Sequence, residues 1–541
     1  MTEERVFDYV VIGAGTAGCV LAARLSADPS CRVLLLEAGL ADNSERISTT
    51  HTWPALYKTD VDWAFQTVPQ VRTRHVHDIP RGRTVGGSGS INAMAFLRGD
   101  RRDFDAWAFQ GCTGWDYESV LPYFKRSESV PHGDPRYRGT SGPLRPAPAA
   151  RLHPLSRAYL AAAQQARHPL TADLNGARLR GVSSHDLLIV DGRRQSTATA
   201  YLEPALGREN LELVPGAFVE RLTVDGDRCT GVDVVVAGDP RHYAATAEIV
   251  LCAGAIGSPH ILLLSGIGPA AELTQVGVKV RHDLPGVGRN LQDHIILAGL
   301  TVQACGPLPA PAGNLGQVTL MADSEPGRAS IDLQIVFIHV PFANPWQAAP
   351  EHGYTFGVGH MRPASRGTLT LASSDARSAP LIDFRYLDED YDVRALVSGV
   401  RHALEISEQA AFDDWRGRSH PLLDADDATV VAFVRDAVQS YGHAAGSCRM
   451  GVDALSVVDP QLRVRGLAGL RVADASIMPE IVSTNTNAAT VMIAERAADL
   501  LGCPAGSVLA QRDVVGLGDV VSLDRPQSVA EALAGLPQEL E

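Results

Sequence analysis

Short apolar runs alternate with loops rich in glycine and proline along most of the chain. The first run, Tyr9 to Ile12, predicts a buried strand, and the residues after Gly18 have the apolar spacing of a helix. A second run at 33–36 predicts another buried strand, which ends at Glu37. The N-terminal pattern is therefore strand, helix, strand, and it predicts an α/β fold.

Four later stretches also combine short apolar strands with glycine turns or helices. Residues 210–236 predict two strands, an Asp-Gly hairpin turn and a further strand. Residues 245–268 predict a buried strand, a glycine turn and a helix. Residues 469–479 predict a short strand and a turn, and 485–502 predict a helix that begins at Asn and Thr residues and stops at Gly502.

The region from about 310 to 440 differs in character. It has strands of alternating polarity at 329–340 and 367–373, followed by amphipathic helices at 392–407 and 427–438. We therefore expect a second domain, an antiparallel sheet with helices, inserted into the first.

Composition narrows the class of protein. A chain of 541 residues exceeds what one hydrophobic core usually serves, and it has no apolar run long enough to span a bilayer. The net charge of −14 argues against a nucleic acid or an anionic membrane as partner. The eight cysteines are scattered without a CxxC pair, and the acidic N-terminus leads directly into a strand. We therefore expect a cytoplasmic protein with reduced thiols.

The turn after the first strand has the spacing of a phosphate-binding loop. Gly13 permits the tight turn, Gly15 lets the backbone approach a pyrophosphate, and Gly18 lets the following helix pack closely. Glu37 ends the next strand, where an acidic residue reaches a ribose hydroxyl. This combination predicts an ADP-containing dinucleotide, either NAD or FAD.

Four further stretches decide between these cofactors, namely 81–107, 254–268, 442–451 and 485–495. Together they resemble the glucose/methanol/choline (GMC) family of flavin-dependent oxidoreductases, and the likeness extends from Phe7 to Gly502. The resemblance implies FAD as cofactor, with NAD as the alternative. It also implies an α/β protein (α+β overall) with a Rossmann-like FAD-binding domain and an inserted substrate domain built on an antiparallel sheet with helices.

The resemblance assigns residues to the cofactor one by one. Gly13, Gly15 and Gly18 would bind the pyrophosphate, Glu37 the adenosine ribose, and Val219 the adenine through its backbone. The full set of expected FAD contacts is Gly13, Gly15, Thr16, Ala17, Gly18, Glu37, Ala38, Arg83, Val85, Gly86, Gly87, Ser90, Asn92, Ala93, Met94, Ala95, Val219, Ala253, Asp474, Ala475, Asn485, Asn487 and Ala488. Asp474 as a turn residue and Val219 as a core residue are the alternatives.

The resemblance also assigns the chemistry, oxidation of an alcohol, expected to be primary, to an aldehyde. Such an oxidation removes a hydride from carbon and a proton from oxygen, and histidine is suited to take the proton because its pKa is about 6.5 in model peptides. His443 would be this base, flavin N5 would take the hydride, and Asn487 would hydrogen-bond the substrate oxygen. As an alternative, Asn487 caps the helix that follows.

Three details of the site follow from the same likeness. Tyr441 and Gly442 would line the substrate pocket, and Gly442 would make it roomier because relatives often have a larger residue there. Some relatives bond the flavin covalently through a histidine at the position of Ile91, so FAD should be non-covalent here. His75 and His77 could suggest a metal, but no third ligand is near in sequence, and we expect a solvated loop and no metal site.

The expected partners are a small-molecule alcohol and an electron acceptor, which is oxygen, a quinone or another carrier, so the enzyme would be an alcohol oxidase or dehydrogenase. A lyase similar to the hydroxynitrile lyases of the same family, which keep FAD without net redox change, is the alternative function, and a binding protein is a third.

The expected domain boundaries follow the changes along the chain between the α/β pattern and the antiparallel pattern. Only residues 527–536 of the tail could be helical, as a surface helix or an extension. The segments are 1–150, 205–300 and 445–503 for the FAD-binding domain, 151–204 and 301–444 for the substrate domain, and 504–541 for the C-terminal tail.

Overall fold

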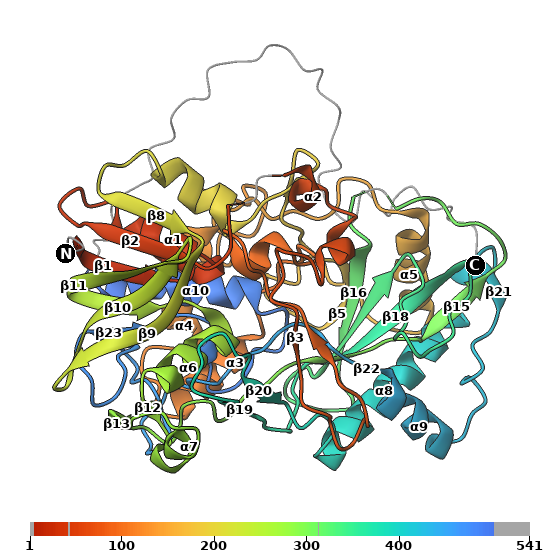
Figure 1. Ribbon diagram of the computed structural model, residues 1–541. Coiled ribbons are helices and arrows are strands. Elements are labelled where there is room, and N and C mark those ends of the chain that lie inside the picture. The colour runs from red at the N-terminus through yellow and green to blue at the C-terminus, as the bar shows by residue number, and fades with distance from the viewer. Residues whose placement is uncertain (1–4, 42–43, 312, 503–541) are drawn as a thin grey trace.

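The computed structural model describes residues 5–41, 44–311 and 313–502. This part of the chain forms two halves that lie side by side, each built around one large sheet (Figure 1). The mixed α/β fold expected from the sequence is confirmed. The possible helix at 527–536 lies outside the described residues.

The first sheet has seven strands in the order β8-β2-β1-β11-β10-β9, with β23 beside β11. Their bounds are β1 Arg5–Ile12, β2 Val33–Glu37, β8 Leu211–Pro215, β9 Ala217–Asp225, β10 Arg228–Val236, β11 Asp239–Leu251 and β23 Leu470–Val472. β8, β2, β1, β11 and β23 run parallel, whereas β9, β10 and β11 are joined antiparallel. Helix α1 (Thr16–Leu25) links β1 to β2, so the predicted strand, helix, strand pattern is confirmed.

The parallel strands of the first sheet end at one common edge. Ile12 at the end of β1 lies beside Leu251 of β11, which lies beside Val472 of β23. Ligands of such sheets bind outside the carboxyl ends of the strands. The loops that begin at Gly13 and Ala38 start at this edge, so the glycine turn and Glu37 are brought to the same place.

The second sheet has eight strands and is antiparallel throughout. Its strands are β5 Gly181–Ser184, β14 Ile295–Leu297, β15 Thr301–Ala304, β16 Gly316–Ala322, β17 Leu333–Ile338, β18 Gly353–His360, β21 Arg416–Arg418 and β22 Val438–Ser440. The antiparallel sheet predicted for the inserted region is confirmed.

Two details of this region differ from the expectation. β14 belongs to the second sheet, although its residues fall in the segment 205–300 that was expected in the FAD-binding domain, because it pairs with β18 and β22. The predicted strand at 367–373 contributes β19 (Thr368–Thr370), which pairs with β20 (Leu381–Asp383) in a separate ribbon.

The remaining elements surround the two sheets. The other ribbons are β3 Phe65–Gln66 with β4 Asp78–Ile79, β6 Ile189–Val190 with β7 Arg193–Arg194, and β12 Ile267–Gly268 with β13 His282–Asp283. The other helices are α2 Glu45–Ser48, α3 Arg101–Phe109, α4 Tyr117–Ser127, α5 Pro154–Gln165, α6 Gly254–Leu264, α7 Ala270–Gln275, α8 Asp390–Ser407, α9 Asp427–Ala437 and α10 Asn487–Leu500. The helices predicted after Gly254, at 392–407, at 427–438 and at 485–502 are confirmed.

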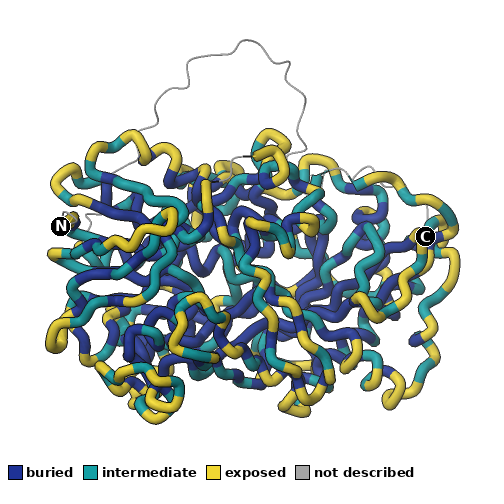
Figure 2. Tube along the Cα trace, in the orientation of Figure 1, coloured by how far each residue is buried: buried dark blue, intermediate teal, exposed yellow. Residues whose placement is uncertain are grey.

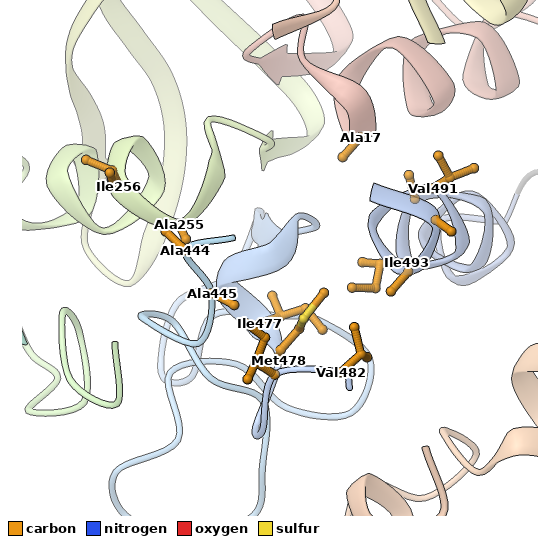
Figure 3. Close-up of a cluster of buried hydrophobic side chains, with 14 of the residues drawn as sticks. Ala17, Ala255, Ile256, Ala444, Ala445, Ile477, Met478, Val482, Val491 and Ile493 are labelled. Carbon is orange, nitrogen blue, oxygen red and sulfur yellow. The ribbon is translucent and has the colours of Figure 1, made fainter. Parts of the chain in front are cut away.

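The core continues through both halves (Figure 2). In the second half, Tyr159 of α5 packs on Phe337 of β17, with ring centroids 5.0 Å apart, and Phe337 packs on Phe356 of β18 at 5.5 Å. Ala17 of α1, Ala255 of α6, and Ala444 and Ala445 after β22 belong to one buried hydrophobic cluster (Figure 3). Residues of α1, of α6 and of the segment that bears His443 therefore share one core.

The hairpin of β3 and β4 holds the two histidines that the sequence placed in a solvated loop. That prediction is wrong for His77, which is 3% exposed and bonds Thr73 Oγ1 through Nε2 at 2.7 Å. Burial lowers the pKa of His77 to about 4. His75 stacks on Trp346, with ring centroids 3.9 Å apart. The described residues contain no group of three His, Cys, Asp or Glu placed to hold a metal ion.

Candidate active site

One cavity of about 790 Å³ lies at the carboxyl edge of the first sheet. It extends from the glycine turn after β1 to the loop that follows β22, where His443 lies. Its wall therefore includes both the residues expected to hold FAD and the expected base.

The glycine turn has the geometry of a site that a ligand approaches. Gly13 has φ +99°, and a Cβ there would lie 2.7 Å from the carbonyl oxygen of Cys252. A Cβ on Gly18 would lie 1.9 Å from the carbonyl oxygen of Gly13, so Gly18 serves the packing of α1. At Gly15 the nearest atom would be the Cα of Gly87 at 3.9 Å, which leaves this stretch of backbone open to the cavity.

Glu37 lies at the end of β2 and is tied to the backbone beside it. Its Oε2 accepts a hydrogen bond from the N–H of Ala14 at 2.9 Å, and its Oε1 accepts one from Gly39 at 2.9 Å. Burial raises the pKa of Glu37 to about 7, while these backbone donors act in the opposite direction. The carboxyl group is thus fixed in the wall, where a ribose hydroxyl would meet it.

The second glycine-rich loop, 82–92, contacts the glycine turn after β1. A Cβ on Gly87 would lie 2.7 Å from the Cα of Gly15, so only glycine lets the two loops touch. Ser90 Oγ donates to the carbonyl of Val85 at 2.9 Å and stabilises the loop from within. Asn92 Oδ1 accepts from the backbone of Met94 and from Arg194, both at 2.9 Å.

Asp474 follows β23 and ties two elements at the cavity. Its Oδ2 accepts from the backbone of Gly254 at 2.8 Å and from Ser258 Oγ at 2.6 Å, at the start of α6. Its Oδ1 accepts from Ser476 N at 2.8 Å. Burial raises its pKa, and these hydrogen bonds oppose the shift.

Most of the residues expected at the cofactor do line this cavity. Those that line it are Gly13, Gly15, Thr16, Ala17, Glu37, Ala38, Arg83, Gly87, Asn92, Ala93, Met94, Ala95, Val219, Ala253, Asp474, Ala475, Asn485 and Asn487. Gly18, Val85, Gly86, Ser90 and Ala488 do not line it. Gly18 and Gly86 pack closely against neighbouring residues, and Ser90 bonds within its own loop. The open backbone at Gly15, the contact between the glycine loops and the fixed Glu37 together fit an FAD.

His443 lies at the other end of the cavity and makes four contacts. Its backbone N–H donates to Asp293 Oδ1 at 2.7 Å. Its Nδ1 lies 2.9 Å from Nδ1 of His294, and its Nε2 lies 3.2 Å from Asn485 Nδ2. Tyr441 stacks on its ring, with centroids 4.6 Å apart.

These contacts define the tautomer of His443. Because the amide nitrogen of Asn485 can only donate, Nε2 of His443 accepts and carries no proton. Its Nδ1 therefore carries the proton and donates to His294. Burial lowers the pKa of His294 well below its usual value and also lowers the pKa of His443, so both rings are neutral.

Asp293 fixes the loop that bears the base. Besides the N–H of His443, it accepts from the hydroxyl groups of Tyr386, at 2.6 Å, and Ser440. Ser440 Oγ in turn accepts from Gly442 N at 2.9 Å. Asp293 is 3% exposed, so this network is shielded from water.

Arg81 places a positive charge beside the base. Its guanidinium donates to the carbonyl oxygens of Gly442 and Pro80 and lines the cavity. Burial lowers the pKa of His443 to about 3, and Arg81 contributes to the shift. The sequence indicated a base near its ordinary pKa, and the structure differs because it buries the ring beside a cation.

The residues next to the base also differ in part from the expectation. Tyr441 and Gly442 line the cavity as predicted. Gly442 has φ +77°, and a Cβ there would lie 3.0 Å from the Arg81 guanidinium. Glycine at this position therefore permits the positive φ of the turn and also leaves space in the pocket.

The two asparagines before α10 have different surroundings. Asn485 contacts His443, whereas Asn487 begins α10, and its Oδ1 is buried without a hydrogen-bond partner among the described residues. Asn487 does not cap the helix, because the N-cap position is Thr486 and the Oδ1 of Asn487 accepts no hydrogen bond from a described residue.

Sequence reasoning missed Arg81, Asp293 and His294. The available signal was an Asp-His pair directly before the apolar run 295–298, where two polar residues at a buried strand need partners.

In the described part of the chain, no helix combines the length and apolar character that a membrane crossing requires. The seven cysteines described, all but Cys503, are free.

The comparisons with known proteins agree on one family. Models described as GMC oxidoreductase match residues 7–296 and 363–494. The chain is 40% identical to human mitochondrial choline dehydrogenase, over 92% of this chain and 90% of that one. It is also 40% identical to the oxygen-dependent choline dehydrogenase of Ectopseudomonas mendocina, over 91% and 93%.

Solved structures give the same result. Pyridoxine 4-oxidase from Mesorbium loti superposes with a TM-score of 0.89 and 34% identity, over 91% of this chain and 98% of that one. Formate oxidase superposes with a TM-score of 0.84 and 26% identity, over 93% and 99%. The four proteins named above are dehydrogenases and oxidases. The chain therefore belongs to the GMC oxidoreductase family and is an FAD-dependent alcohol oxidoreductase.

Proposed function

We propose that this enzyme oxidises a primary alcohol to an aldehyde with His443 as the general base. The observation that carries the proposal is the protonation pattern of His443, which lines the cavity and has Nε2 beside the amide of Asn485 and Nδ1 bonded to His294. Bound FAD supplies the acceptor for the hydride, its N5 atom. The protein residues supply the place for the alcohol and for its proton.

The proton step uses groups that are already oriented. The alcohol hydroxyl would replace the amide of Asn485 as the hydrogen-bond donor to Nε2 of His443 and pass its proton there as the C–H bond breaks. The Asn485 amide, displaced by this hydroxyl, would then donate to the substrate oxygen. Asn487, for which the sequence predicted this role, has an unpaired Oδ1 and is proposed to face the cofactor instead.

The cofactor would lie along the opposite part of the cavity. Gly13 and Gly15 would meet its pyrophosphate, Glu37 its ribose and the backbone at Val219 its adenine. The N-terminus of α10 carries the positive end of the helix dipole, which favours negative charge on a ligand placed there. We propose non-covalent attachment, because Ile91 offers no nucleophile.

Anaerobic mixing with alcohols tests the reaction. An alcohol oxidoreductase loses the yellow colour of its flavin when a substrate is added without oxygen, and an aldehyde accumulates in equal amount. Turnover of a cyanohydrin with the flavin still yellow would instead indicate the lyase alternative.

We propose an electron acceptor that is a small molecule and a cytoplasmic location. Oxygen, a quinone or another carrier would reoxidise the flavin. Stopped-flow rates of flavin reoxidation in air-saturated buffer and with an added quinone distinguish these acceptors.

A cytoplasmic location is consistent with the free cysteines, and cell fractionation with an antibody to the chain tests it.

A further inference from the structure

The charged groups around the cavity are distributed unevenly. Among the described residues, two carboxylates line it, Glu37 and Asp474. Both lie at the carboxyl edge of the first sheet, and both are occupied by backbone N–H groups. Both carboxylates therefore lie in the part of the cavity proposed for FAD and not beside His443.

The carboxylate nearest the base is also occupied. Asp293 is bonded to the N–H of His443 and to the hydroxyl groups of Tyr386 and Ser440. It does not line the cavity and it is buried. The loop that bears His443 therefore separates a cation in the cavity from the carboxylate of Asp293.

Three arginines also line the cavity. Arg81 lies beside His443, and Arg83 and Arg377 line the wall as well. The guanidinium of Arg83 lies 5.0 Å from the ring centroid of Trp63, and that of Arg377 lies 4.7 Å from the ring of Phe218. Arg83 and Arg377 thus occupy two of the aromatic faces of the wall, and Trp53, Tyr57, Phe65 and Tyr441 supply the other aromatic side chains that line it.

We propose that the site takes alcohols that carry no positive charge and discriminates against ammonium alcohols such as choline. The proposal rests on the function proposed above and specifies its substrate class. It separates this enzyme from the relatives named for choline, with which it shares 40% identity. The physical reason is that an ammonium group would lose its hydration beside Arg81 without gaining a carboxylate.

A matched pair of alcohols tests the proposal. Choline and its tert-butyl analogue, in which carbon replaces the nitrogen, have nearly the same shape and differ by one charge. We expect kcat/KM for anaerobic flavin reduction to be about 10- to 100-fold higher for the tert-butyl analogue. Equal values, or a preference for choline, would overturn the proposal.

A binding measurement separates this result from failure of the proposed reaction. Both alcohols can be titrated against the oxidised holoenzyme and followed by the change in flavin absorbance, which requires no turnover. Tighter binding of the tert-butyl analogue supports the substrate class even if neither alcohol reduces the flavin. Failure of every tested alcohol to reduce the flavin would count against the proposed reaction only.

A pair of variants tests the role of the missing carboxylate. Tyr441 stacks on His443 and lines the cavity, so Tyr441→Glu places a carboxylate next to the substrate position. Tyr441→Gln has the same size without the charge. The ratio of kcat/KM for choline to that for the tert-butyl analogue should rise about 10-fold or more in Tyr441→Glu relative to Tyr441→Gln. An unchanged ratio in two folded, FAD-containing variants would contradict the proposal.

Discussion

The Nδ1 atoms of His443 and His294 lie 2.9 Å apart, so one hydrogen bond joins the proposed base to a second buried imidazole. Because Asn485 donates to the other nitrogen of His443, this bond fixes the ring with Nε2 free of a proton. The arrangement makes His294 a positioning residue, which acts on the reaction through His443.

Replacement of His294 should therefore slow flavin reduction without loss of FAD. In His294→Ala the acceptor for Nδ1 is lost and the ring can rotate or change tautomer, so we expect a loss of roughly 10- to 100-fold in the reduction rate. His294→Asn keeps an acceptor oxygen and should recover part of this loss. Equal rates for the two variants would show that His294 contributes only packing.

Removal of the base should have a larger effect. His443→Gln should reduce the rate of anaerobic flavin reduction by roughly 10²- to 10⁴-fold, the range for general-base catalysis. FAD content should stay normal, because the proposed nucleotide contacts lie at the other end of the cavity. A near-normal rate in the FAD-containing variant would place the base elsewhere.

The activity of the wild-type enzyme should depend little on pH near neutrality. Only the unprotonated imidazole accepts a proton, and burial with the help of Arg81 lowers the pKa of His443 to about 3. The base is therefore already competent at pH 5, and kcat/KM for flavin reduction should be flat from there to pH 8. A rise centred between pH 6 and 7 that disappears in His443→Gln would contradict this assignment.

The sequence predicted the parts of the site that depend on local pattern. The turn at Gly13, the strand before it and the helix after it are consecutive, so apolar spacing and glycine positions suffice to define them. The contacts of His443 are not local, since Asp293 lies 150 residues from it and Arg81 lies 361 residues from Gly442. The pairing of β14 with β22 brings Asp293 to the base, and apolar periodicity does not reveal which strands pair.

The choice between Asn485 and Asn487 could not be made from sequence for a related reason. The two residues are close in the chain, and the exact start of α10 decides which side chain turns toward the base. A difference of two positions rotates a side chain by more than half a turn around a helix, so an error of that size changes its surroundings. The structure begins the helix at Asn487 and leaves Asn485 in the loop beside His443.

The two asparagines should therefore differ in their effects on the reaction. Asn485→Ala removes the donor next to Nε2 of His443, and with it the hydrogen bond proposed to hold the substrate oxygen. We expect flavin reduction to slow by roughly 10²- to 10³-fold, as for loss of one donor to a reacting oxygen, with FAD retained. Asn487→Ala should change the affinity for FAD or the flavin spectrum and slow the reduction less. The measurement is the rate of anaerobic reduction per bound FAD for both variants, with Asn485→Asp as the control that keeps the size of the side chain and loses its donor. If Asn487→Ala were the slower variant while its FAD content and spectrum stayed normal, Asn487 would be the residue that binds the substrate oxygen, as the sequence first indicated.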